Sequence, residues 1–359
     1  MSNVRALLSG LACLAAMASA HAGGTVVYVS SADAQEIAVL SLDRASGELK
    51  PIETVPVGGT AMPMALSPDR RMLYAALRSQ PFRVVSFAID AGSGRLSKRG
   101  EASLADSMAN IDVDRSGRWL FAASYGGNKI SVNAIGQDGS VGAVQQLLAT
   151  KPNAHAIHAD ASNRYVLATS LGGDNLSVWR FDAASGTLTA NEPALVTAPA
   201  KAGPRHFVWD AAQRRLYMLC ELDASLLVYD WDAASGTLRE AQRASALPPG
   251  FNGGAPWAAD LHLTPDGKFL YASERRSSTL ATYKVDAASG RLELIGHTPT
   301  EKTPRGFAID PSGRYLIAAG QDSNGVTVYA IDAASGALSQ RARLPLGKNP
   351  NWVEIVELP

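Results

Sequence analysis

A seven-residue pattern, Asp-x-x-Ser-Gly-x-Leu, recurs along the chain and constrains its fold more than any other feature. Full copies begin at Asp43, Asp90, Asp182, Asp232, Asp286 and Asp332, and a weaker copy at residues 137–141 fills the one gap. The glycines of these copies are 47, 45, 47, 50, 54 and 46 residues apart. Repeats of this length are typical of β-propeller blades, in which each repeat is one four-stranded unit. The pattern therefore predicts seven copies of one module.

Each module can be divided into four strands by its turn residues. A second recurring stretch, rich in Asp, Pro, Ser and Gly, precedes each Asp-x-x-Ser-Gly copy, as at residues 114–117 and 310–313. These residue types favour β-turns. An apolar strand follows this turn, as at residues 269–273, and then a strand with alternating side chains, as at residues 326–329. We name the strands A to D in chain order, with the Asp-x-x-Ser-Gly turn between C and D. The repeated Asp, Ser and Gly are interpreted as turn residues and not as catalytic groups.

The two ends of the chain complete one blade together. Residues 25–55 provide strands B, C and D but no strand A, whereas residues 349–356 match strand A of the preceding module at residues 303–310. The sequence thus predicts an all-β fold, a seven-bladed β-propeller with four antiparallel strands per blade. Its ring is closed by the C-terminal strand joining the N-terminal blade, which leaves no long exposed edge.

The first residues have the features of an export signal. Arg5 precedes an apolar run at residues 6–18, and two small-x-small sites end at Ala20 and Ala22. This pattern is typical of a secretory signal peptide and is too short to span a membrane. We expect residues 1–22 to be a cleaved signal peptide, residues 23–359 to form the propeller, and the protein to be periplasmic or secreted. Lipid attachment at Cys13 is a weaker alternative. Removal of the signal leaves one cysteine, Cys220, so no internal disulfide can form.

Charge and motif content restrict the function further. Lys and Arg total 33 residues and Asp and Glu also total 33, so the charge gives no case for nucleic acid or an anionic membrane as partner. The sequence contains no Gly-rich phosphate loop and no zinc-ligand spacing. We expect a monomer that uses no metal and no cofactor and acts on a small molecule.

Alignment of the modules on the turn between strands A and B identifies two sets of residues. The A-start residues, five positions before the turn, are Asn351, Met62, Ala109, His155, Arg205, Ala259 and Arg305 in blades one to seven. The B-end residues, eleven positions after the first turn residue, are Ala32, Arg78, Tyr125, Leu171, Glu221, Arg275 and Gln321. Because strands A and B are antiparallel, both sets face the same mouth of the central channel. The polar members break the repeat, and function is expected where the blades differ.

These residues favour attack of water on a carbonyl group. Either His155 or Glu221 can accept the proton of the water. Arg205 and Arg275 can stabilise the resulting oxyanion. The alternative is that these charged residues form ion pairs that fill the channel, since structural ion-pair networks also cluster in such places. Strand alternation predicts that His206, next to Arg205, points into or between the blades, although it remains a candidate substrate contact.

With these residues identified, the chain resembles the 6-phosphogluconolactonase family of seven-bladed propellers, which includes carboxymuconate-lactonising enzymes. The resemblance covers the mature chain and rests on these segments: residues 124–127 (SYGG), 152–155 (PNAH), 203–206 (GPRH), 220–222 (CEL), 272–275 (ASER), 304–307 (PRGF) and 319–321 (AGQ). It implies that His155, Glu221, Arg205 and Arg275 are catalytic. Three positions depart from the family pattern: Asn153 replaces a common His, Glu274 replaces an Asn, and Asn351-Trp352 replaces a smaller pair.

The resemblance implies hydrolysis of a sugar-derived lactone of the gluconolactone or 6-phosphogluconolactone type. Expected substrate-binding residues are Arg305, Gln321, Asn351, Tyr125, Arg78 and His206. Arg78 and Arg305 could bind a phosphate, whereas Gln321, Asn351 and Tyr125 suit sugar hydroxyls. Since export separates the protein from cytoplasmic sugar phosphates, we expect a preference for free gluconolactone. The alternative function is that of a non-catalytic periplasmic propeller that binds a ligand or a protein partner.

Overall fold

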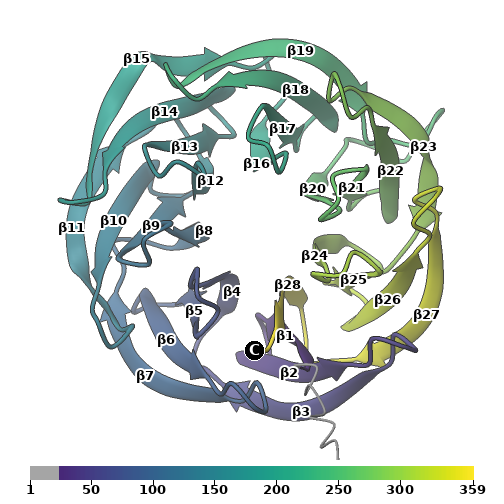
Figure 1. Cartoon of the computed structure of the whole chain (residues 1–359), viewed down its shortest axis with the longest axis horizontal. Helices are drawn as coiled ribbons and strands as arrows, with labels where there is room; N and C mark the ends of the chain where they lie inside the picture. The colour runs from purple at the N-terminus through teal and green to yellow at the C-terminus, as the bar shows by residue number, and fades with distance from the viewer. Residues whose placement is uncertain (1–23) are drawn as a thin grey trace, which may run out of the picture.

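The fold is a ring of seven sheets around a central channel (Figure 1). The computed structural model describes residues 24–359; the expected signal peptide lies outside the described residues. Each sheet has four strands that pair with antiparallel neighbours, so the predicted all-β propeller with four strands per blade is confirmed. Within residues 24–359, no helix is long and apolar enough to cross a membrane.

The strands follow the predicted order A to D in every blade, from the channel outward. The A strands of blades one to seven are β28 (Pro350–Glu357), β4 (Ala61–Leu66), β8 (Met108–Val113), β12 (Ala154–Ala159), β16 (Pro204–Trp209), β20 (Ala258–Leu263) and β24 (Pro304–Ile309). The B strands are β1 (Thr25–Ser31), β5 (Met72–Leu77), β9 (Trp119–Ser124), β13 (Tyr165–Ser170), β17 (Arg215–Cys220), β21 (Phe269–Glu274) and β25 (Tyr315–Gly320).

The outer half of each blade consists of strands C and D. The C strands are β2 (Glu36–Leu42), β6 (Arg83–Ile89), β10 (Lys129–Ile135), β14 (Asn175–Asp182), β18 (Ser225–Asp232), β22 (Thr279–Val285) and β26 (Gly325–Ile331). The D strands are β3 (Leu49–Pro56), β7 (Leu96–Ser103), β11 (Val141–Ala149), β15 (Thr187–Thr197), β19 (Thr237–Ser245), β23 (Leu292–Pro299) and β27 (Leu338–Pro345). The B strands are almost fully buried and the D strands are largely exposed, as their apolar and polar compositions predict.

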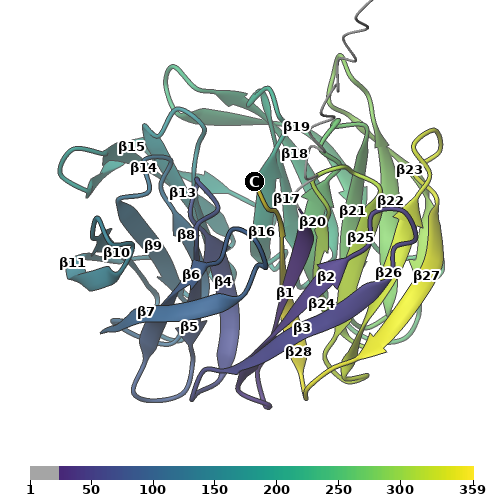
Figure 2. The ribbon, with the colours of Figure 1, turned by 60° about the horizontal axis from the view of Figure 1, so that its bottom comes forward.

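The ring is closed by the C-terminal strand, as the sequence predicts. Strand β28 pairs antiparallel with β1, with Thr25 opposite Glu357 and Ser31 opposite Pro350. Figure 2 shows β28 alongside β1 in the N-terminal blade. The C-terminal segment adds Val356 of β28 and the following Leu358 to the apolar layer between blades one and two. The N-terminal blade therefore depends on both ends of the chain.

The repeated Asp-x-x-Ser-Gly turn serves structure in two ways. In the turn at residues 43–47, the Asp43 carboxylate accepts the backbone N–H groups of Ala45 and Ser46, and Gly47 has a φ of 78°, which favours glycine. The turn glycines also contact the preceding blade; for example, the hydroxyl of Tyr28 in blade one donates to the carbonyl of Gly94 in blade two at 2.8 Å. The turn thus fixes the blade and joins it to its neighbour, which explains its repetition without any catalytic role.

Candidate functional site

The first mouth of the channel is the end where strands A begin and strands B end, and the structure brings the two predicted residue sets together there. In six of the seven blades, the residue that follows strand B donates its backbone N–H to the segment that leads into strand A. These bonds include Glu221 to the Gly203 carbonyl at 2.7 Å and Gln321 to the Thr303 carbonyl at 3.1 Å. The bonds hold the B-end residues beside the A-start residues.

Bulges at the start of the A strands set the direction of the A-start side chains. On β16 the pairing passes from Pro204 to His206, so Arg205 has no partner on β17. Arg305 lies in the same position on β24, and a similar irregularity includes His155 on β12. A bulged residue lies outside the regular alternation of side chains. The sequence alignment located these positions correctly, but it did not indicate the bulges.

Glu221 holds two guanidinium groups at the centre of the first mouth. Its Oε2 atom accepts from Arg205 Nε at 2.8 Å and from an Arg275 terminal nitrogen at 2.8 Å. Both arginine side chains are only 1% exposed and also donate to backbone carbonyls, Arg205 to Ala259 and Arg275 to Trp257 and Ala258. The ion pairs that the alternative interpretation expected are therefore present, and they position both arginines rigidly.

The electrostatics of this network fix its charge states. Burial by itself would raise the pKa of Glu221, but Arg205 and Arg275 outweigh it and hold that pKa below its usual value, so Glu221 is ionised near neutral pH. Burial, and then the charge of Arg205, lower the pKa of Arg275 to about 9. The pKa of His155 lies well below its usual value because the side chain is buried and Arg205 is near. His155 is therefore a neutral imidazole at pH 7.

Two further arginines leave the first mouth with excess positive charge. Among residues 24–359, the Arg305 side chain has no hydrogen-bond or ion-pair partner, and burial followed by Arg205 lowers its pKa. Arg78 donates from Nε to Ser107 Oγ at 3.0 Å. The first mouth thus holds four guanidinium groups, three of which act on the carboxylate of Glu221, and this excess of positive charge suits an anionic group or an oxyanion.

His155 lies between Tyr125 and His206. The centres of the Tyr125 and His155 rings are 6.1 Å apart, and those of His155 and His206 are 5.1 Å apart. The prediction that His206 points into or between the blades is wrong: its ring contacts His155, Trp352 and Asp260 on the A strands of three other blades. The bulge at Arg205 changes the alternation of β16 and turns His206 toward the channel.

The remaining predicted contacts occupy one side of the first mouth. Gln321 donates to the side chain of Asn349 at 2.8 Å, and Asn351 is fully buried with its amide donating to the Asn349 carbonyl. Sequence reasoning missed Trp257, whose ring lies 3.9 Å from the Arg275 guanidinium carbon. With Gln321 and Asn349 it lines a hollow of about 460 Å³. The signal for Trp257 was the 54-residue interval between repeats, the longest in the chain, which contains this loop.

The fold and the mouth can be compared with known proteins. A family model described as "Lactonase, 7-bladed beta-propeller" matches residues 25–355. The chain belongs to this lactonase family. A 6-phosphogluconolactonase of Pectobacterium carotovorum is 44% identical over 285 residues, which are 79% of this chain and 84% of that protein. A 6-phosphogluconolactonase of Serratia proteamaculans is 40% identical over the same share of this chain and 85% of its own length.

A solved structure extends the comparison to almost the whole propeller. The periplasmic gluconolactonase of Pseudomonas aeruginosa superimposes with a TM-score of 0.88 at 29% identity, covering 94% of this chain and 100% of that one. The relatives and this neighbour carry the names of lactonases that differ in whether the sugar is phosphorylated. The predicted family and enzyme class are therefore confirmed.

Proposed function

We propose that this lactonase hydrolyses a sugar-derived lactone at the first mouth of the channel without a metal. One observation supports this most directly: Arg205, Glu221 and Arg275 form a buried network beside a neutral His155 in a chain of the lactonase family. Each group has a charge state that suits attack of water on a carbonyl.

We assign His155 as the acceptor of the proton from water. Glu221 is a poorer acceptor because its Oε2 atom already accepts from two guanidinium groups, whereas the neutral imidazole of His155 has a lone pair available at neutral pH. Arg205 and Arg275 then stabilise the oxyanion, since their positions are fixed before the reaction begins. Glu221 holds both arginines in place. The proton on His155 passes to the ring oxygen of the lactone as the carbon–oxygen bond breaks.

The substrate is proposed to be an unphosphorylated aldonolactone such as gluconolactone. The expected signal peptide at residues 1–22 and the likeness to a periplasmic gluconolactonase support action outside the cytoplasm. Gln321, Asn351 and Tyr125 would bind hydroxyls, and Arg305 and Arg78 are the groups that would bind the phosphate of the alternative substrate. The names of the relatives favour that alternative.

The test is steady-state kinetics in a pH-stat on gluconolactone and on 6-phosphogluconolactone, corrected for spontaneous hydrolysis. We expect a higher kcat/KM for gluconolactone. His155→Ala, Arg205→Ala and Arg275→Ala should each lower kcat/KM by about 100-fold or more. Near wild-type rates in all three folded variants would exclude this mouth as the active site. A folded wild-type protein without turnover on any sugar lactone would favour a binding protein.

A further inference from the structure

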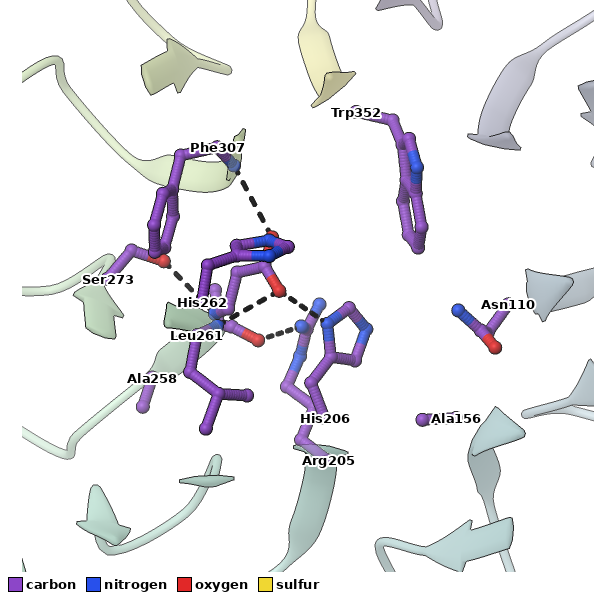
Figure 3. A network of polar contacts seen from close by, with 12 residues as sticks. Asn110, Ala156, Arg205, His206, Ala258, Leu261, His262, Ser273, Phe307 and Trp352 are labelled. Atoms are coloured by element: carbon purple, nitrogen blue, oxygen red, sulfur yellow. Dashed lines mark hydrogen bonds and ion pairs between the residues drawn. The ribbon is translucent and has the colours of Figure 1, made fainter. Parts of the chain in front are cut away.

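His155 lies beside His206, which belongs to a polar network around a buried carboxylate deeper in the channel. Nδ1 of His206 lies 2.7 Å from Asp260 Oδ1, and Nε2 of His262 lies 3.2 Å from Asp260 Oδ2. The carboxylate also accepts the backbone N–H groups of Leu261 at 3.0 Å and Phe307 at 3.3 Å. Figure 3 shows His206, His262 and Trp352 projecting from three blades into one space. Nothing in the proposed lactone chemistry so far uses this network.

The network fixes which nitrogen of His206 carries the proton. Burial would raise the pKa of Asp260, but His262 and His206 outweigh it and hold that pKa well below its usual value, so Asp260 is a carboxylate. Burial and then Arg205 lower the pKa of His206 to about 4, so this imidazole is neutral at pH 7. A neutral imidazole that faces a carboxylate with Nδ1 must carry its single proton there. Its Nε2 is then a lone-pair acceptor.

The two neighbouring imidazoles have complementary unpaired nitrogens. Among residues 24–359, neither His206 Nε2 nor His155 Nδ1 has a hydrogen-bond partner, and both atoms are buried. The His155 and His206 rings are 5.1 Å apart with an angle of 63° between their planes. No hydrogen bond joins the two nitrogens in this arrangement of the rings, so the pairing requires a rotation of the side chains. A buried polar atom without a partner is costly, which favours this pairing.

We propose that Asp260 and His206 are positioning residues that hold His155 as the Nδ1–H tautomer, with its Nε2 free to accept the proton of the attacking water. The inference rests on the proposed function, in which His155 is that acceptor. In this arrangement the Asp260 carboxylate fixes the tautomer of His206, and His206 in turn fixes the tautomer of His155. The same logic operates where an aspartate orients a catalytic histidine.

The pair of Asp260 and His206 also offsets an unfavourable charge interaction at the first mouth. His155 becomes a cation when it takes the proton, although burial and then the charge of Arg205 already lower its pKa. The carboxylate of Asp260 lies 2.7 Å from His206 Nδ1, and in the proposed arrangement its negative charge stabilises that cation through the ring of His206. No oxidant or other reactant is needed. Water adds to the carbonyl carbon, the ring carbon–oxygen bond breaks, and the proton moves from water through His155 Nε2 to the ring oxygen.

The tautomer of His155 can be read directly, without turnover, by long-range ¹H–¹⁵N NMR of protein labelled with ¹⁵N-histidine; the chain has six histidines. We expect the Nδ1–H form of His155 in the wild-type protein at pH 7. His206→Phe keeps an aromatic ring against His155 and Trp352 but removes the acceptor, so His155 should become a mixture of tautomers. His206→Gln keeps an acceptor oxygen and should preserve part of the wild-type signal and activity.

Activity supplies the second readout. His206→Phe and Asp260→Asn should lower kcat at least about tenfold while KM changes little, because the substrate contacts remain. Asp112→Asn is the matched control: Asp112 is another channel carboxylate beside a histidine, 3.3 Å from His158 Nδ1, and it also accepts a backbone N–H. This variant should keep both the His155 tautomer and kcat.

The outcomes separate the inference from the proposed function. An Nε2–H form of His155 in the wild-type protein, or an unchanged tautomer in both His206→Phe and Asp260→Asn, would overturn the inference whatever the rates. Full activity of His155→Ala would overturn the assignment of His155 as acceptor, yet the tautomer measurements would still report whether Asp260 and His206 order that ring. Thermal melting of each variant checks that it is folded.

Discussion

Replacement of Glu221 by glutamine tests whether the buried network produces the activity. Glu221 is 14% exposed on its side chain and accepts two charge-assisted hydrogen bonds from arginines that are 1% exposed. Removal of its charge leaves two buried guanidinium groups uncompensated, and breaking a buried ion pair in this way costs about 3–5 kcal/mol. Glutamine keeps one oxygen as an acceptor, so the lower end of that range is expected. The loss in stability corresponds to several degrees in Tm.

The activity of Glu221→Gln should fall by about 100-fold in kcat/KM, equivalent to about 2.7 kcal/mol of transition-state stabilisation. The reason is that Arg205 and Arg275 lose the group that aims them at the oxyanion. Glu301→Gln is the control for stability, since Glu301 is 6% exposed and pairs with Arg343 at 2.9 Å outside the network. It should lower Tm with little effect on kcat/KM. A folded Glu221→Gln enzyme with wild-type kcat/KM in the pH-stat would refute the reasoning.

The remaining predictions concern closure, export, specificity and pH. Deletion of residues 349–359 should abolish the cooperative thermal transition in circular dichroism, because the N-terminal blade loses β28 and exposes strand edges. N-terminal sequencing of the protein from its native host should begin near His21 or Gly23, and an intact Met1 would contradict export. Arg305→Ala should raise KM for 6-phosphogluconolactone more than for gluconolactone, measured with both substrates. Burial raises the pKa of Glu354 to about 7. The folded protein therefore has its full stability below the pKa of this group in the unfolded chain, and it loses part of that stability as pH rises through 7. Glu354→Gln should raise Tm relative to wild type at pH 8 but not at pH 4.

The architecture was predictable because local chemistry and global topology agree in this chain. The Asp-x-x-Ser-Gly turns need a glycine with positive φ and an aspartate that caps the turn, and both requirements are visible in sequence. The shared pattern of residues 303–310 and 349–356 identified the closing strand because every A strand packs in the same environment. The packing of the turn glycines against the preceding blade was not predictable, since those contacts join residues about 65 positions apart, as between Tyr28 and Gly94.

Most residues of the candidate site could be predicted from the sequence, but the direction of the His206 side chain could not, and the bulge at Arg205 explains why. Counting from the turns placed Arg205 and Glu221 at one mouth, because the turns fix the ends of strands A and B. The extra residue at Arg205 breaks the two-residue period, and one such break reverses the face of every residue that follows on the strand. His206 consequently reaches the channel, where it meets Asp260 and His155. The irregularity that takes Arg205 out of the pairing of β16 also places His206 beside His155. In the proposed mechanism, a single bulge therefore provides both the arginine at the oxyanion and the residue that orients the proton acceptor.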